Sequence, residues 1–309
     1  MGYCYLILAV LGLGSIGVIG EVICSKQIDW TALLLLRYLI AGIFLWGLSG
    51  LQGVWRPHKI GAAIWVGVIC EGFQSILFFS GIQRIGVGIT ALILYFYPLL
   101  VLFFSVIPRP LLQKKKESSS FGLSFHRSST GISKLLKWQM VLSILGPLLA
   151  SYPLLLKGNN IHYVGFIAAI GASVCYGYYF SHGANYLSLI PPFMAASFSC
   201  FGALLIMFPV FLFNNEIGSI WAVAYQNLSW TLLLSILTAL PLLFLVKGMQ
   251  RTNGLIAAII FSLEPFITIC LSSIFLGTRL HLITWIGGVF SLLMIVYIEW
   301  MKTKRSLAS

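Results

Sequence analysis

The stretch that decides the fold runs Gly248-Met-Gln-Arg-Thr-Asn-Gly-Leu-Ile-Ala-Ala-Ile-Ile-Phe-Ser-Leu-Glu-Pro265. A second copy, 167 residues earlier, runs Gly81-Ile-Gln-Arg-Ile-Gly-Val-Gly-Ile-Thr-Ala-Leu-Ile-Leu-Tyr-Phe-Tyr-Pro98. Aligned without a gap, the copies are identical at 7 of 18 positions, and the shared Gly-x-Gln-Arg interrupts the apolar run at the same place in both. These copies indicate an internal repeat, which has to be recognised before a fold is chosen.

The composition places the chain in a membrane. Of its 309 residues, 59% are hydrophobic and 8% are charged, and the mean hydropathy is +0.98. Soluble domains carry about 25% charged residues. Because so little polar surface cannot cover a water-soluble globule of this length, and the long apolar runs lack the alternation of a membrane β-barrel, we predict an all-α integral membrane protein with the lipid bilayer as a partner.

Ten apolar runs are long enough to cross a bilayer as helices, which takes about 20 residues each. They cover residues 3–23, 31–51, 60–82, 86–107, 138–157, 162–182, 190–213, 229–249, 254–276 and 282–301. Small residues recur at every fourth position of the sixth run, which favours a close helix–helix contact there, although such residues can also line a pathway. They are Gly165, Ala169, Ser173, Gly177 and Ser181.

Lysine and arginine set the expected orientation, because cytoplasmic segments are enriched in both. With a cytoplasmic N-terminus, 14 of the 19 basic residues lie inside and 5 outside. We therefore expect both termini, including a tail over 302–309, in the cytoplasm of a cell whose inner membrane holds the chain. The net charge of +12 is then a topology signal, and no nucleic-acid partner is expected.

A basic, serine-rich segment over 108–137 separates the fourth and fifth runs. It contains Lys114-Lys-Lys-Glu-Ser-Ser-Ser and is too polar to span the membrane. We predict a cytoplasmic loop without fixed structure. Two roles stay open: a tolerated insertion held near anionic lipid, or a loop that binds a partner or is phosphorylated.

The repeat divides the chain into two halves, 1–157 and 158–301, with five predicted spans in each. Since five is an odd number, the second half enters the membrane from the opposite side. Two inverted five-helix repeats are typical of secondary transporters, whose substrate site lies near the bilayer midplane between the halves.

Three stretches resemble the drug/metabolite transporter superfamily, and within it the EamA-type ten-helix carriers. They are Arg37-Tyr-Leu-Ile-Ala-Gly, Ala91-Leu-Ile-Leu-Tyr-Phe-Tyr-Pro98, and Ala257-Ala-Ile-Ile-Phe-Ser-Leu-Glu-Pro265 running on to Phe275-Leu-Gly-Thr-Arg-Leu280. The family usually has Leu-Gly-Glu-Arg where this chain has Leu-Gly-Thr-Arg. The resemblance implies flux of amino acids or related metabolites, often as export, across the inner membrane of bacteria.

Glu71 is the candidate that carries most of the predicted chemistry. It lies near the middle of the third run, with Gln74 on the same helix face. Ionisable groups at that depth are costly and usually face a pathway or a partner. We expect no lysine or arginine at matching depth, so Glu71 would be protonated or paired with a cationic substrate, as in proton exchange. A neutral Glu71 that hydrogen-bonds a neighbouring helix is the structural alternative.

Glu264 precedes Pro265 in the ninth run, and their repeat counterparts are Tyr97 and Pro98. A proline inside a helix frees a carbonyl and can kink the chain. Glu264 is therefore a candidate for substrate contact, with a structural bonding role as the alternative. Pro98 and Pro265 are candidate hinges.

Further candidates come from tyrosines deep in the spans and from two charged residues nearer the outer face. Tyrosine rings could stack on a ligand, including a cation, or could simply pack with their hydroxyls bonded to backbone. We expect the charged residues to pair with each other or to extend toward the interface, and a gate role is possible for them. The tyrosines are Tyr95, Tyr97, Tyr176 and Tyr179, and the charged residues are Glu21 and Arg37.

The leading functional hypothesis is a secondary carrier, monomeric or homodimeric, for a small amino-acid-like or amine-like metabolite, coupled to protons or working by exchange. No cofactor or metal is expected, because six cysteines and five histidines are dispersed without CxxC or HExxH. Absence of a nucleotide-binding or catalytic motif argues against a pump or an enzyme. Alternatives are an exchanger of a larger cationic or nucleotide-type metabolite, and a non-transporting receptor or assembly protein.

Overall fold

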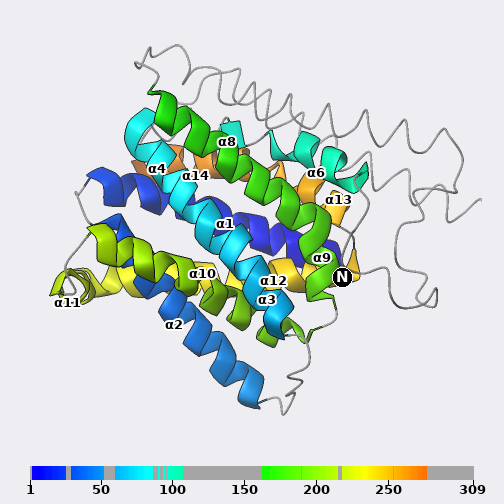
Figure 1. Cartoon of the computed structure of the whole chain (residues 1–309), viewed down its shortest axis with the longest axis horizontal. Coiled ribbons are helices and arrows are strands. Elements are labelled where there is room, and N and C mark those ends of the chain that lie inside the picture. The colour runs from blue at the N-terminus through cyan, green and yellow to red at the C-terminus, as the bar shows by residue number, and fades with distance from the viewer. Residues whose placement is uncertain are drawn as a thin grey trace, which may run out of the picture.

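The computed structural model describes residues 2–25, 29–51, 60–85, 90, 93–94, 96–106, 162–188, 190–214, 218–252 and 254–276. Every element in these ranges is a helix (Figure 1). In chain order they are α1 (Gly2–Ser25), α2 (Trp30–Leu51), α3 (Ile60–Val66), η2 (Gly67–Phe73), α4 (Gln74–Ile85), α6 (Tyr97–Val106), α8 (Tyr163–Tyr178), η3 (Tyr179–Gly183), α9 (Ala184–Leu187), α10 (Pro192–Asn214), α11 (Gly218–Gln226), α12 (Leu228–Arg251), α13 (Gly254–Phe261) and α14 (Glu264–Leu276).

Seven stretches in the described ranges are long and apolar enough to cross a membrane. They coincide with the first, second, third and sixth to ninth predicted spans, which confirms the helical class. The fourth is described only in part, and the fifth (138–157), the tenth (282–301) and the loop 108–137 lie outside the described residues. The seven stretches are Gly2–Ile19, Trp30–Leu51, Ile60–Ile85, Tyr163–Gly183, Pro192–Phe213, Leu228–Arg251 and Ile256–Phe275.

The packing of these helices follows the sequence repeat. α1 packs on α12 and α14, whereas α8 packs on their counterparts in the other half, α4 and α6. Figure 1 shows α4 and α8 side by side. α2 packs on α10, its own counterpart, and α6 packs on α13. Exchanging the two halves of the chain therefore converts the two pairs made by α1 into the two made by α8 and leaves the α2–α10 pair in place.

Individual residues at these contacts also correspond. A Cβ atom built on Gly2 would lie 3.1 Å from Cβ of Arg251, and one built on Gly165 would lie 2.7 Å from Cβ of Arg84, the repeat counterpart of Arg251. The absence of a side chain at both glycines allows this approach. The predicted close contact along the sixth span is thus confirmed at Gly165.

A second pair of glycines behaves in the same way at the fourth and ninth spans. A Cβ on Gly14 would lie 2.9 Å from Cγ2 of Ile267, and one on Gly177 would lie 2.7 Å from Cβ of Leu100. Leu100 and Ile267 are 167 residues apart, the offset of the repeat. In addition, Ser173 donates a hydrogen bond to the Leu94 carbonyl at 3.0 Å, so the small-residue stripe of the sixth span serves helix packing.

Four of the spans are interrupted, three near their middle and the sixth near its C-terminal end. The third and sixth contain π-helices, η2 and η3. The ninth breaks at a turn over Ser262 and Leu263, and the described part of the fourth has a turn at Phe96. Pro98 and Pro265 each occupy the second position of the helix that follows such a turn, where a proline is tolerated because its missing N–H needs no partner. Both prolines therefore lie at helix starts and do not kink a continuous helix, and their role as hinges stays a prediction.

Candidate functional site

A hydroxyl network surrounds Glu71, which lies in η2 and is partly buried. Its carboxylate accepts a hydrogen bond from the Tyr38 hydroxyl of α2, at 3.3 Å from Oε2. Ser75 Oγ lies 2.9 Å from the same hydroxyl. Gln74 adds only a 3.5 Å contact, in which its amide oxygen accepts from Ser75. Two helices are thus joined around one carboxylate.

Arg37 completes this network. Its position corrects the prediction that no lysine or arginine lies at the depth of Glu71. It was expected near the outer face with Glu21, and no basic residue was expected at the depth of Glu71. Instead Arg37 is 6% exposed, and its Nη2 donates to the Tyr38 hydroxyl at 3.0 Å and to Ser75 Oγ at 3.3 Å. Position in a span gives the depth of the Cα atom only, and the long arginine side chain reaches inward from there. The Glu21 side chain lies outside the described residues.

Glu264 is the first residue of α14 and is also partly buried. Its Oε2 accepts from the Tyr176 hydroxyl at 3.5 Å, the long limit for a hydrogen bond. In the described part of the chain, no lysine or arginine lies within ion-pair distance of this carboxylate. The environment of Glu264 is therefore aromatic rather than cationic.

Aromatic rings fill the space beside Glu264. The Tyr97 ring lies 5.0 Å from that of Tyr176, edge to face, and 5.3 Å from that of Phe180, stacked. Phe180 in turn lies 5.2 Å from Phe261, on α13. The Tyr97 hydroxyl donates to the Ala258 carbonyl at 2.9 Å, which is the packing role that was left open for it. Tyr97 thereby ties the fourth span to the ninth.

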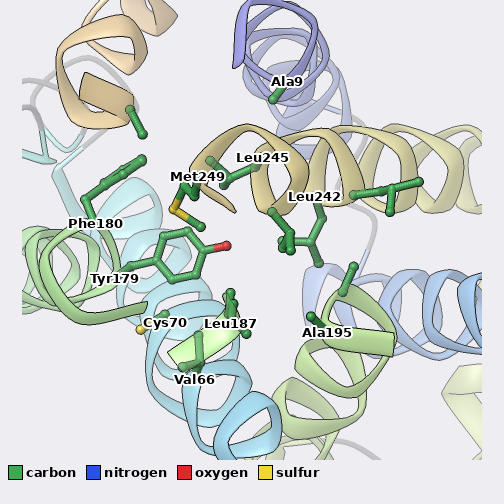
Figure 2. Packing of buried hydrophobic residues seen from close by; sticks show 14 of the residues in the cluster. Ala9, Val66, Cys70, Tyr179, Phe180, Leu187, Ala195, Leu242, Leu245 and Met249 are labelled. Carbon is green, nitrogen blue, oxygen red and sulfur yellow. The ribbon is translucent and has the colours of Figure 1, made fainter. Parts of the chain in front are cut away.

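Tyr179 lies on η3 between the two acidic centres. Its ring is 1% exposed and its hydroxyl has no hydrogen-bond partner in the described part of the chain. Figure 2 shows the hydroxyl pointing away from η3 among Met249, Leu187 and Leu242. Tyr179 is close enough to Glu71 for an electrostatic interaction, while the neighbouring Phe180 contacts the rings beside Glu264.

Gln250, near the end of α12, links this helix to a neighbouring connection. Its Nε2 donates to the carbonyls of Leu187, at 2.8 Å, and Ile190, at 2.9 Å. These carbonyls belong to the connection between the sixth and seventh spans. The repeat counterpart Gln83 is exposed at the end of α4, so the two copies of Gly-x-Gln-Arg are in different environments.

The structure brings together Arg37, Glu71 and Gln74 in one network and Tyr97, Tyr176 and Glu264 in another; Tyr95 lies outside the described residues. Sequence reasoning missed Tyr38, Ser75 and Gln250. Tyr38 follows Arg37 directly, and Ser75 lies one turn after Glu71, so helical spacing could have identified both once the two spans were known to be neighbours. The described residues contain no group of three or more His, Cys, Asp or Glu side chains that could hold a metal ion.

Comparisons with known proteins agree with this arrangement. A family model described as the EamA-like transporter family matches residues 1–109 and 163–300. No curated protein is similar enough to match. A solved structure titled "Crystal structure of protein" has a TM-score of 0.73 and 14% sequence identity, and the match covers 100% of this chain and 99% of that one. At this identity the structural match supports the fold alone.

The family match covers parts of both halves and leaves out residues 110–162, which include most of the basic segment and the predicted fifth span. Together with seven described helices that are able to cross a membrane, it identifies the chain as a multi-pass membrane protein of the drug/metabolite transporter type. The chain belongs to the EamA-like transporter family.

Proposed function

We propose that this transporter is a secondary carrier that moves a small organic metabolite bearing an amine group across the cytoplasmic membrane, in exchange for protons or for another metabolite. The observation that carries the proposal is the pair of partly buried carboxylates, Glu71 and Glu264, each at an interruption of a membrane-spanning helix. Ionisable residues in spans mark substrate or proton pathways, and interrupted helices form substrate sites in secondary transporters.

The two carboxylates have different roles in this proposal. Glu71 shares the Tyr38 hydroxyl with the Arg37 guanidinium, so a positive charge is held close to it across that hydroxyl. Among the described residues, aromatic rings lie beside Glu264 and its carboxylate has a single long hydrogen bond. We assign substrate-amine or proton binding to Glu264, and the aromatic rings beside it can contact a bound cation. Glu71 holds the network that shapes the other side of the site.

The repeat suggests how the protein changes conformation during transport. The symmetric helix pairs support two inverted units, 1–157 and 158–301, which exchange conformations during transport. In the state described here, Gln250 ties α12 to the connection between the sixth and seventh spans. Opening that end requires both hydrogen bonds to break, and Gln83 makes the corresponding contact at the opposite end in the alternative state. With both termini in the cytoplasm, the Gln250 end faces inward.

Purified protein in liposomes tests the proposal. Vesicles are loaded with a mixture of the twenty amino acids and their decarboxylated amines, and the release of each is followed after an inward-acid or inward-alkaline pH step. We expect flux of at least one amine-bearing compound, without ATP, that changes direction or rate with the pH gradient. Protein-free vesicles provide the background. Absence of flux for every compound would favour the receptor or assembly alternative.

A further inference from the structure

Two basic side chains lie near the end of α12 without an acidic partner. Lys247 and Arg251 are four residues apart, so they share one face of the helix. Arg251 is exposed and Lys247 is partly buried. Neither side chain makes a hydrogen bond or an ion pair with a residue that the structure describes. Because like charges at this spacing repel each other, a bound anion would stabilise this basic pair.

Aromatic rings from two other helices hold the basic pair in place. The Nζ atom of Lys247 lies 4.6 Å from the centre of the Phe193 ring, on α10, and 5.8 Å from that of Tyr5, on α1. The Cζ atom of Arg251 lies 4.9 Å from the same Tyr5 ring, which stacks on Phe244 at 6.0 Å. A ring face attracts a cation within about 6 Å. The ring contacts leave the N–H groups of both cations available to an acceptor from outside the bundle.

The basic pair lies where three spans end at one membrane surface. The span Leu228–Arg251 ends there, and the spans Gly2–Ile19 and Pro192–Phe213 begin there, because α12 packs on both α1 and α10 and the rings come from the first turns of these two helices. A Cβ atom built on Gly2 would lie only 3.1 Å from Cβ of Arg251. Basic and aromatic side chains at the ends of spans lie at the level of the lipid headgroups.

The equivalent place in the first half of the chain has one basic residue instead of two. The repeat counterpart of Lys247 is Ser80, and that of Arg251 is Arg84. Arg84 Nη1 donates to the Ser80 carbonyl at 3.0 Å, so this arginine binds the end of its own helix. Arg251 makes no such bond in the described part of the chain and contacts a ring instead.

The ring is also missing from that equivalent place. Ala168 lies 163 residues after Tyr5, which is the separation of the corresponding glycines Gly2 and Gly165. The second cation and the aromatic ring are therefore present together at one end of the repeat and absent together at the other. A general need of helix ends for positive charge explains Arg84 but does not explain this difference.

We propose that Lys247 and Arg251 form a binding site for the phosphate of an anionic phospholipid, in the leaflet that adjoins this end of the bundle. Phosphate oxygens are strong acceptors for ammonium and guanidinium N–H groups, and anionic lipids attract basic residues beside a span. A headgroup with a net negative charge is favoured over a zwitterionic one, because the amine of the latter would meet two cations. Inorganic phosphate offers the same acceptor atoms, but the position of the pair at the ends of three spans favours a lipid.

The experiment uses the full chain purified in a non-ionic detergent and mixed with equal amounts of phosphatidylglycerol and phosphatidylcholine of distinguishable mass. Native mass spectrometry measures how much of each lipid stays on the protein. For wild-type protein we expect phosphatidylglycerol to be retained at least about tenfold more than phosphatidylcholine. Lys247→Gln and Arg251→Gln should each lower this preference about fivefold, as the loss of one basic residue near an anionic headgroup implies. Lys247→Arg keeps the charge and should keep the preference.

Arg84→Gln is the matched control, because it removes one positive charge at the repeat-equivalent position. It should leave the preference unchanged, and thermal unfolding with phosphatidylcholine alone checks that each variant is folded. Equal retention of the two lipids by wild-type protein overturns the site, as does a preference that both glutamine variants leave intact or that Arg84→Gln lowers equally.

A further arm adds inorganic phosphate at the concentration of the lipid. Release of the bound phosphatidylglycerol would show that the basic pair binds a soluble phosphate, which overturns the assignment to a lipid. Retention of the lipid, together with a loss of preference in both glutamine variants alone, supports the site. This test needs no transport, so its outcome is independent of the proposed carrier function.

Discussion

The two acidic centres differ in how their charge is balanced. At Glu71, the Arg37 guanidinium reaches the same Tyr38 hydroxyl as the carboxylate, and Ser75 adds a further bond. At Glu264, one long bond from Tyr176 is accompanied by aromatic rings, without a cation at ion-pair distance in the described part of the chain. A guanidinium held nearby favours the charged form of a carboxylate, whereas a carboxylate without a neighbouring cation more readily alternates between a proton and a cationic ligand.

The repeat shows how this asymmetry is built. The position equivalent to Glu71 in the second half is Thr238, and the position equivalent to Glu264 in the first half is Tyr97. Both replacements donate to backbone: Thr238 to the Leu234 carbonyl at 2.7 Å and Tyr97 to the Ala258 carbonyl at 2.9 Å. Each half thus contributes one acid on a different helix and one hydroxyl at the equivalent place, so the two halves place unlike groups in the proposed site.

The largest expected effect is on transport, and it follows replacement of Glu264, which has no cation at ion-pair distance among the described residues. Glu264→Gln keeps the shape and hydrogen bonding of the side chain but cannot carry a charge or exchange a proton. We expect amine-substrate flux in liposomes to fall by about 100-fold or more, as the loss of one partner of a buried ion pair implies, and the remaining flux to be independent of pH.

Tyr97→Phe is the matched control, because it changes the repeat-equivalent position and removes a hydroxyl that is bonded only to backbone. It should retain most of the flux and its pH dependence. Wild-type rate and pH dependence in Glu264→Gln would show that this carboxylate is structural, and the contrast between the two acidic centres would lose its functional meaning.

At Glu71 the expected effect is on stability. Glu71→Gln removes the carboxylate that Arg37 faces across the Tyr38 hydroxyl, and Arg37→Gln removes the guanidinium from the other side of that hydroxyl. Each single change should reduce the free energy of unfolding by about 3 kcal/mol. The double variant should be less destabilised than the sum of the two, because the uncompensated charge disappears. Thermal unfolding of detergent-purified protein measures all three. Additive losses would show that the two groups do not interact through Tyr38.

The predicted coupling of Glu71 and Arg37 replaces the expectation from the sequence that no basic residue lies near Glu71. The repeat, the helical class and the two acids could be recognised in the sequence, because hydrophobic runs and repeated motifs report span number and relationship. The position of Arg37 near Glu71 could not be recognised in the sequence, because Arg37 lies 34 residues away on another helix. Its Cα atom lies at a different depth in the membrane, and its long side chain extends toward Glu71. The helix interruptions were equally hidden: prolines at 98 and 265 marked their places, but whether a proline kinks a helix or starts a new one depends on the hydrogen bonds around it.

The two copies of Gly-x-Gln-Arg also differ between the halves of the chain, since Gln250 is hydrogen-bonded and Gln83 is exposed. Gln250→Leu removes both hydrogen bonds to the Leu187 and Ile190 carbonyls, at about 1 kcal/mol each. The equilibrium should shift by about tenfold or more toward the state that is open at that end. A cysteine introduced at Ser188, which is exposed beside these carbonyls, should then react faster with a soluble maleimide. Gln83→Leu should change that rate in the opposite direction, because Gln83 is exposed in the present state and its proposed contact forms only in the state that is open at the Gln250 end.

The smallest expected effect is on stability, and it distinguishes Tyr176, beside Glu264, from Tyr38, beside Glu71. Tyr176→Phe removes a 3.5 Å hydrogen bond to Glu264, and Tyr38→Phe removes the hydroxyl that joins Arg37, Ser75 and Glu71 at 2.9–3.3 Å. A weak bond contributes little, so the first change should cost well under about 1 kcal/mol, and the second should cost about 2 kcal/mol or more because several buried groups lose their partner. Thermal unfolding under identical detergent conditions compares them, and the ring contacts are retained in both variants. If Tyr176→Phe were the more destabilising change, the Glu264 centre would depend on its hydroxyl as strongly as the Glu71 centre does. The assignment of the mobile proton to Glu264 would then lose its structural basis, because both carboxylates would be held in fixed networks.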